Sequence, residues 1–202
     1  LLLSGAVSPV WSQEQATSLT VGQPIVREMR GGEQHSYQVK LNAGQHARVV
    51  VDQKGIDVVL ALLGADGKPL HEVDNNLSGT RGMEVVSLVA DAGDTYVFNV
   101  RPLEKGASVG RYEVRLEDLR TATQTDRTRV AAERSYFVAA QLQNERTADP
   151  RRKAIERYAE ALRLMREAGD GRGEAMTLTN MGTLYNLLGE PQKAHEHLDQ
   201  AL

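Results

Sequence analysis

The C-terminal part of the chain contains a segment that repeats itself, and this repeat constrains the fold more than any other feature. The ten residues that start at Lys153 (KAIERYAEAL) and the ten that start at Lys193 (KAHEHLDQAL) share Lys, Ala, Glu, Ala and Leu at matching positions. The two copies are offset by 40 residues. A period of this size is typical of stacked helical units, each of which buries its apolar face against the next. We therefore predict an α-helical solenoid over residues 120–202, with further helices expected to follow Leu202.

The sequence between the two copies predicts a helix, a turn and a second helix. Gly189 is a helix-stop residue, and Pro191 suits the first turn of the next helix, where its missing N–H is not needed. Gly182 is expected where the two helices cross, close to Ala194 or Leu198, because a small residue lets their axes approach. The first helix carries one apolar stripe at helical spacing, formed by Ala175, Leu178, Met181, Gly182, Tyr185 and Leu188.

This pattern, Leu178-x-x-Met-Gly-x-x-Tyr185-x-x-x-Gly189-x-x-x-x-Ala194-x-x-x-Leu198-x-x-Ala201, resembles the tetratricopeptide repeat in its long form of about 40 residues. The resemblance implies a non-catalytic scaffold that binds a protein or peptide partner in a groove lined by the first helix of each repeat. By that resemblance, Thr179, Thr183 and Asn186 point into the groove.

The preceding helical pair follows the pattern less closely. We predict helices over about 126–144 and from Asp149-Pro150 onward, with Asp149 as the cap. Counting back 40 residues from Gly182 and Tyr185 reaches Leu142 and Glu145, which do not fit the repeat. The first helix is therefore either a divergent repeat helix or an N-terminal cap. The glycine-rich stretch 169–173 lacks the Gly-Lys-Ser/Thr ending of a phosphate-binding loop, so we interpret it as part of a turn that extends to Glu174.

Residues 13–119 have a different period, in which apolar and polar residues alternate. Tyr37, Val39 and Leu41 alternate with polar neighbours, and the same pattern recurs around 47–51, 96–100 and 112–116. Residues 56–63 are almost continuously apolar, which predicts an inner strand. Turn signals such as Asp66-Gly67 separate the runs. Seven to nine short strands without a helix predict an antiparallel, jelly-roll-like β-sandwich, closely coupled to the helices through the short polar stretch 121–126.

This half resembles the bacterial pre-peptidase C-terminal type of β-sandwich. The resemblance rests on Gly32-Glu-x-His-x-Tyr37, on Gly55-Ile-Asp-Val-Val-Leu60 and on Gly110-Arg-Tyr112. Such modules accompany secreted enzymes and are not catalytic themselves. The order of sandwich and long repeats also resembles the N-terminal part of proteins that end in a caspase-like (CHAT) protease domain, which would lie beyond Leu202.

Charge and composition exclude several classes of function. The net charge of −3 argues against nucleic acid as the partner, since phosphate binding requires an excess of clustered cations. The chain has no cysteine, which excludes disulfides and cysteine-bound zinc. Residues 1–12 are apolar and uncharged, and the small-residue pattern Val10-Trp11-Ser12 is typical of a signal-peptidase site. We therefore expect an exported protein without a membrane span in its mature form.

No set of residues predicts catalysis, a cofactor or a metal site, so we do not expect enzymatic activity from these residues. His195 and His197 lie on different faces of a helix and are interpreted as solvated surface residues. Asp52 and Asp57 flank the inner strand, but nothing in the sequence places them in a cleft. The residues expected in a turn after a strand, where they could contact a cation, are His71, Glu72 and Asp74.

Three hypotheses remain open on the sequence alone. The first is a non-catalytic interaction scaffold of an exported protein. The second is the regulatory front of a secreted caspase-like protease, and the third is a carbohydrate- or cation-binding β-sandwich.

Overall fold

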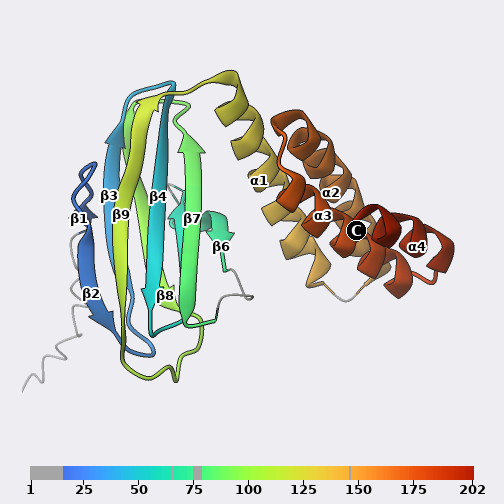
Figure 1. Cartoon of the computed structure of the whole chain (residues 1–202), viewed down its shortest axis with the longest axis horizontal. Coiled ribbons are helices and arrows are strands. Elements are labelled where there is room, and N and C mark those ends of the chain that lie inside the picture. The colour runs from blue at the N-terminus through green and yellow to red at the C-terminus, as the bar shows by residue number, and fades with distance from the viewer. Residues whose placement is uncertain (1–15, 65, 75–78, 146) are drawn as a thin grey trace, which may run out of the picture.

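In the computed structural model, nine strands form a β-sandwich and four helices follow it (Figure 1). The structure describes residues 16–64, 66–74, 79–145 and 147–202. The predicted signal segment, residues 1–12, lies outside these ranges. The strands are β1 (Thr17–Ser18), β2 (Ile25–Met29), β3 (His35–Leu41), β4 (Gln45–Lys54), β5 (Val58–Leu63), β6 (Pro69–Val73), β7 (Arg81–Val89), β8 (Asp94–Pro102) and β9 (Gly110–Thr121). The helices are α1 (Gln124–Gln143), α2 (Ala148–Ala168), α3 (Gly171–Leu187) and α4 (Pro191–Gln200).

The strands form two sheets, with the orders β1-β3-β8-β5-β6 and β2-β9-β4-β7. The eight strands β2 to β9 are arranged as in a jelly roll. In each sheet, strands from the first half of this series (β2 to β5) alternate with strands from the second half (β6 to β9). All neighbouring pairs are antiparallel except β1 and β3, which run parallel. The predicted fold class, a jelly-roll-like sandwich followed by a helical region, is confirmed.

The sandwich core is built by the predicted alternation of side chains. Tyr37 and Tyr112 come from opposite sheets and are fully buried. Their hydroxyl oxygens lie 2.5 Å apart, and His35 Nδ1 lies 2.6 Å from the Tyr112 hydroxyl, so the polar ends of both rings are hydrogen-bonded inside the core. The first five residues of β5 are all buried, as expected for an inner strand.

β9 contains a β-bulge close to the point where it leads into the helices. Arg48 of β4 pairs with Asp118, whereas the next residue, Val49, pairs with Leu116, so Glu117 is an extra residue in β9. The extra residue shifts the inward side of the strand, and Leu119 instead of Asp118 packs against the core. Asp118 therefore remains on the outer side of the sandwich, where it can bind charged residues.

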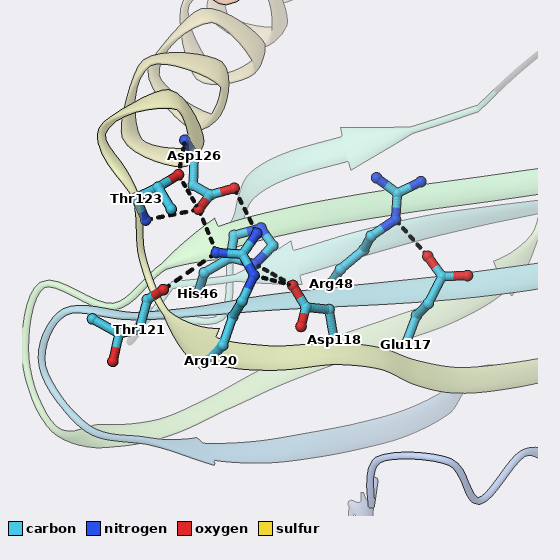
Figure 2. Close-up of polar contacts among 8 residues, drawn as sticks. All are labelled: His46, Arg48, Glu117, Asp118, Arg120, Thr121, Thr123 and Asp126. Carbon is cyan, nitrogen blue, oxygen red and sulfur yellow. Dashed lines mark hydrogen bonds and ion pairs between the residues drawn. The ribbon is translucent and has the colours of Figure 1, made fainter.

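Arg120 and Asp126 connect the end of the sandwich to the start of α1 (Figure 2). Arg120 Nη1 lies 2.5 Å from Asp126 Oδ2, and Arg120 Nε lies 2.9 Å from Asp118 Oδ2. Thr123 caps α1, because its hydroxyl accepts a hydrogen bond from the Asp126 N–H while the Asp126 carboxylate accepts one from the Thr123 N–H. The expected close coupling is thus built from a capping box and an ion pair. Arg120 and Thr121 belong to β9, two residues beyond the predicted start of the helical region.

The helices pack as two successive pairs, α1 with α2 and α3 with α4. Gly182 lies at the crossing of α3 and α4, as predicted: a Cβ atom added there would lie 2.7 Å from Leu198 Cγ and 3.1 Å from the Ala194 carbonyl oxygen. In the first pair, the buried Ala139 packs in the same cluster as Ala154. Ala139 precedes Gly182 by 43 residues, and α2 begins 43 residues before α4. Counting back 40 residues therefore missed the small residue of α1 by three positions.

Two predicted helix boundaries are wrong. Thr147, not Asp149, is the N-cap of α2. The turn after α2 is shorter than expected, since α3 already begins at Gly171 with Asp170 as its N-cap. The Asp170 carboxylate accepts a hydrogen bond from the Gly173 N–H, and this cap allows the glycine-rich stretch to enter the helix. None of the helices in the described ranges is both long and apolar enough to cross a bilayer.

Candidate binding cleft

A cleft of about 740 Å³ lies between the sandwich and the helices. Its sandwich side is formed by β6 and β7, which are edge strands of the two different sheets. Its helical side is formed by α1 and by the N-terminal half of α3. Figure 1 shows α1 beside β7 and β6, with α2 and α3 on its far side. The volume lies within the range of ligand sites, about 300–1,000 Å³.

The helical wall of the cleft is aromatic and rigid. Tyr136 packs edge-on against Tyr158 of α2, with 5.3 Å between the ring centroids. The Tyr136 hydroxyl also accepts a hydrogen bond from Asn180 Nδ2 at 2.8 Å, which ties α1 to α3. Met176 of α3 is 42% exposed and faces Met83 of β7, which is 53% exposed, across the same cleft. Exposed thioethers on both walls provide an adaptable apolar surface.

His71 of β6 contacts α1 at the side of the cleft. Its ring packs edge-on against Phe137 with 5.9 Å between centroids, and its Nδ1 lies 3.9 Å from Glu133 Oε2. Burial, assisted by Arg134, lowers the pKa of His71 to about 4, so the ring is neutral at pH 7. Burial likewise raises the pKa of Glu133 to about 7. His71 is therefore neutral in this contact at pH 7 while Glu133 is about half ionised, whereas both partners of the Arg120–Asp126 ion pair are charged.

Carboxylates gather on the sandwich wall of the cleft. Glu72 and Asp74 line it, and the Arg101 guanidinium donates to Glu72 at 2.9 Å. The pKa of Asp74 is raised by burial and by the nearby charges of Asp57 and Glu72, with Arg101 acting in the opposite direction. Among the described residues, the Oδ1 atoms of Asp57 and Asp74 are buried and have no hydrogen-bond partner. The wall thus carries more negative charge than Arg101 balances.

The predicted position of the His71, Glu72 and Asp74 group is wrong. His71 and Glu72 lie within the edge strand β6, and Asp74 directly follows it. Their side chains alternate along the strand, so His71 turns toward α1 while Glu72 pairs with Arg101. Within the described residues, no three His, Asp or Glu side chains are grouped so that they could bind a metal ion.

Thr179, Thr183 and Asn186 are exposed on α3. Their spacing places them on the side that begins with Met176, so they extend the helical wall away from the sandwich. The Thr179 and Thr183 hydroxyls donate to carbonyl oxygens four residues earlier in the helix, those of Ala175 and Thr179. Each hydroxyl oxygen remains free to accept a further hydrogen bond. Their role in partner binding stays a prediction.

The two histidines of α4 differ from each other, which corrects their joint interpretation as solvated residues. His195 is exposed. His197 is half-buried and stacks on Tyr185 with 5.2 Å between centroids and an interplanar angle of 3°. Lys193 lies over the same Tyr185 ring, 5.3 Å from its centroid. His197 thus helps to close the contact between α3 and α4.

Sequence reasoning missed the cleft itself, including Tyr136, Phe137 and Met176. The available signal was the spacing of Phe137 and Ala140, which places apolar residues on α1 beside the side that packs on α2. Which strand these residues face depends on the jelly-roll topology, and the spacing does not contain that information.

Residues 151–202 match the family model of the tetratricopeptide repeat. The matched region begins within α2 and includes α3 and α4, whereas α1 lies outside it. The C-terminal part of this chain is therefore a tetratricopeptide repeat region. No curated protein matches the sequence.

Several solved structures are similar to the sandwich half. The pre-peptidase C-terminal domain of a collagenase from Bacillus anthracis is 17% identical, with 52% of this chain and 96% of that chain covered and a TM-score of 0.40. PliG from Aeromonas hydrophila, a periplasmic inhibitor of g-type lysozyme, is 12% identical over 49% of this chain and 93% of that chain, with a TM-score of 0.36. A carbohydrate-binding module of Cellvibrio mixtus lichenase 5A is 14% identical over 45% and 75%, with a TM-score of 0.27. These low values carry no information about a ligand or an activity.

Proposed function

We propose that this chain is a non-catalytic interaction module of an exported protein, and that it binds a segment of a partner protein in the cleft between the sandwich and α1 and α3. The observation that carries the proposal is the cleft itself, because both of its walls present exposed apolar side chains, Met83 and Met176, beside fixed aromatic rings. Exposed apolar surface bordered by polar groups is typical of binding sites.

The shape of the cleft favours a peptide segment over a globular surface. Its walls come from two units joined by a capped, ion-paired junction, so the space between them is held open in the absence of a partner. Thr179, Thr183 and Asn186 continue the helical wall, which gives a bound segment a path along α3 beyond the cleft. A preformed site reduces the ordering cost of binding.

A selection of random peptides displayed on phage against the whole chain tests this function. Peptides that are enriched are synthesised with a fluorophore, and their Kd is measured by fluorescence anisotropy. We expect Met176→Glu to weaken binding at least tenfold, and Thr183→Glu to weaken it for peptides long enough to follow α3. The matched control is Val26→Glu, because Val26 is an exposed apolar residue on β2, at the other edge of its sheet. Failure to enrich any peptide, or equal effects of Met176→Glu and Val26→Glu, would contradict the proposal.

Export and a following protease domain are separate parts of the proposal. Export rests on the apolar residues 1–12 with their small-residue pattern. N-terminal mass spectrometry of the protein recovered outside the cytoplasm is expected to show cleavage after Ser12. A caspase-like domain remains a prediction from resemblance, and the reading frame after Leu202 tests it.

A further inference from the structure

We infer that the sandwich wall of the cleft selects a partner segment that carries a lysine or arginine beside an apolar residue. This inference rests on the proposed function and adds the chemical class of the partner. It assigns the recognition of the cation to Asp74 and Glu72, which line the cleft, with Asp57 adding negative charge next to Asp74. The recognition of the apolar neighbour is assigned to Met83, Phe137 and Met176.

Unbalanced charge is the first argument. Asp74 lies close enough to Asp57 and Glu72 for their charges to raise its pKa, and Glu104 acts on the pKa of Asp57 in the same way. Arg101 neutralises part of this charge through its hydrogen bond to Glu72. Like charges held together in a partly desolvated place are unfavourable, and a cation that binds between them relieves this repulsion. The wall is therefore complementary to an ammonium or guanidinium group.

Hydrogen-bonding capacity is the second argument. The Oδ1 atoms of Asp57 and Asp74 are buried, and no residue in the described ranges donates to them. A buried carboxylate oxygen without a donor is costly, because it has lost its hydration without a replacement. A lysine ammonium offers three donors and an arginine guanidinium offers five, so either side chain can supply the missing donor to Asp74, which is the one of these two residues that lines the cleft.

The distribution of charge across the cleft sets the orientation of the bound segment. Arg172 lies on the helical wall, on the side opposite to Glu72 and Asp74. A basic side chain is repelled from Arg172 and attracted to the sandwich wall, so it points toward β6. The residue beside it then faces the apolar surface of Phe137, Met83 and Met176. An acidic side chain in the same position would lie against Asp74 and be repelled by it.

The test uses the whole chain and fluorescent peptides obtained by display selection. Each peptide that contains arginine is compared with the same peptide in which citrulline, a neutral residue of the same shape, replaces it; norleucine replaces lysine in the same way. We expect the neutral peptides to bind about tenfold more weakly to the wild-type chain. On Asp74→Asn the difference between charged and neutral peptides should fall to less than about threefold, since the coupling between two groups disappears when one is removed. Asp57→Asn provides a second variant should Asp74→Asn fail to fold.

Asp199→Asn is the matched control, because Asp199 is an exposed carboxylate on α4 and does not line the cleft. It should preserve the full tenfold difference. If Met176→Glu weakens peptide binding but charged and neutral peptides bind equally well, the inference about the basic residue is overturned while the interaction module stands. If the preference persists on both Asp74→Asn and Asp57→Asn, the cation is bound elsewhere and the inference is equally overturned. If no peptide binds at all, both the proposed function and the inference about the basic residue fail.

Discussion

The sandwich and the helical region of this chain are stabilised in different ways. The sandwich has one continuous core in which large rings, Tyr37, Phe98 and Tyr112, are fully buried between two sheets. The helices have two smaller clusters, one around Ala139 and Tyr158 and the other around Ala132 and Ala161. The comparison indicates that the sandwich can be stable by itself, whereas the helices depend on their neighbours.

The two regions also differ in the separation of their contacts along the chain. In the sandwich, β4 pairs with β7 and β9, so its central strands come together only after long loops close. In the helical region each helix packs mainly on the next one. Local contacts form quickly and non-local pairings form slowly. The helices are therefore expected to form faster than the sandwich. The same short-range packing limits the size of their core.

The largest expected effect comes from the sandwich core. Phe98→Ala leaves a cavity between the sheets and should lower the free energy of unfolding of the sandwich by about 3–5 kcal/mol. Hydrogen exchange of the strand amides at increasing urea concentration reports on the sandwich, and ellipticity at 222 nm reports mainly on the helices. Val26→Ala on the exposed edge serves as control and should change stability by less than about 0.5 kcal/mol. If the helical signal shifts as much as the sandwich signal, the two regions unfold as one unit and the comparison is wrong.

The next effect concerns the contact between α3 and α4. Gly182→Leu must push Leu198 and the backbone of Ala194 away, and we expect a loss of about 1–3 kcal/mol that is confined to the helical transition. Gly182→Ala should lie between this variant and the wild type, because the helix propensity of alanine returns about 1 kcal/mol. Gly171→Leu is the matched control, since a Cβ atom there has no neighbour within 4 Å. A Gly182→Leu variant that melts at or above the wild-type temperature would show that α3 and α4 cross elsewhere.

A smaller effect should appear at the contact between the two regions. The folded pKa of Glu133, about 7, lies above its ordinary value of 4.5, so the folded state retains a proton that the unfolded state releases. Stability is therefore lost as the pH rises from 4.5 to 7. Glu133→Gln removes this dependence, and we expect it to be more stable than the wild type by about 1–2 kcal/mol at pH 8. This is less than the full pKa shift implies at about 1.4 kcal/mol per unit, because the Glu133 side chain is 27% exposed. Urea unfolding at several pH values measures it, and parallel curves for the two proteins would contradict the prediction.

The smallest effect is expected at the junction of Figure 2. Hydrogen bonds from Arg120 and Thr123 hold the pKa of Asp126 well below its usual range. Such a group stabilises the folded state above its unfolded pKa, and this contribution is lost as the pH falls. Asp126→Asn should cost about 1 kcal/mol at pH 7, as for the loss of a helix cap, and the difference from wild type should decrease as the pH falls below 3.8, the ordinary pKa of the group. Hydrogen exchange in the first turn of α1 measures the local effect, with Asp149→Asn, in the first turn of α2, as control.

Much of the fold follows from local patterns in the sequence. Alternation around Tyr37 and Tyr112 identifies strands and their buried sides, and the small residue at Gly182 identifies a helix crossing. The bulge at Glu117 is not visible in this way, because it depends on the pairing of β9 with β4. Helix starts such as Gly171 also escape prediction, since the Asp170 cap outweighs the low helix propensity of the glycines.

The candidate site could be predicted only in part. Thr179, Thr183 and Asn186 are exposed where the repeat resemblance places them, but the cleft beside them combines β6, β7, α1 and α3. His71 was identified as a polar residue near a turn, yet its burial against Phe137 arises from tertiary packing between distant segments. Such a meeting of elements depends on the topology of the whole chain, which local periodicity does not determine.

The position of β9 has a mechanical consequence for the helices. This strand lies between β2 and β4 in its sheet and passes into α1 through Ala122 and Thr123. Tension applied to the helices is therefore delivered along the axis of a strand that pairs with β4 from Arg111 to Thr121 and with β2 from Gly110 to Val114, and its hydrogen bonds are loaded together in shear. A helix attached to an edge strand would instead detach that strand one bond at a time. A partner that pulls on α3 or α4 should accordingly unravel the helices before it disrupts the sandwich, which would remain as a fixed anchor under load.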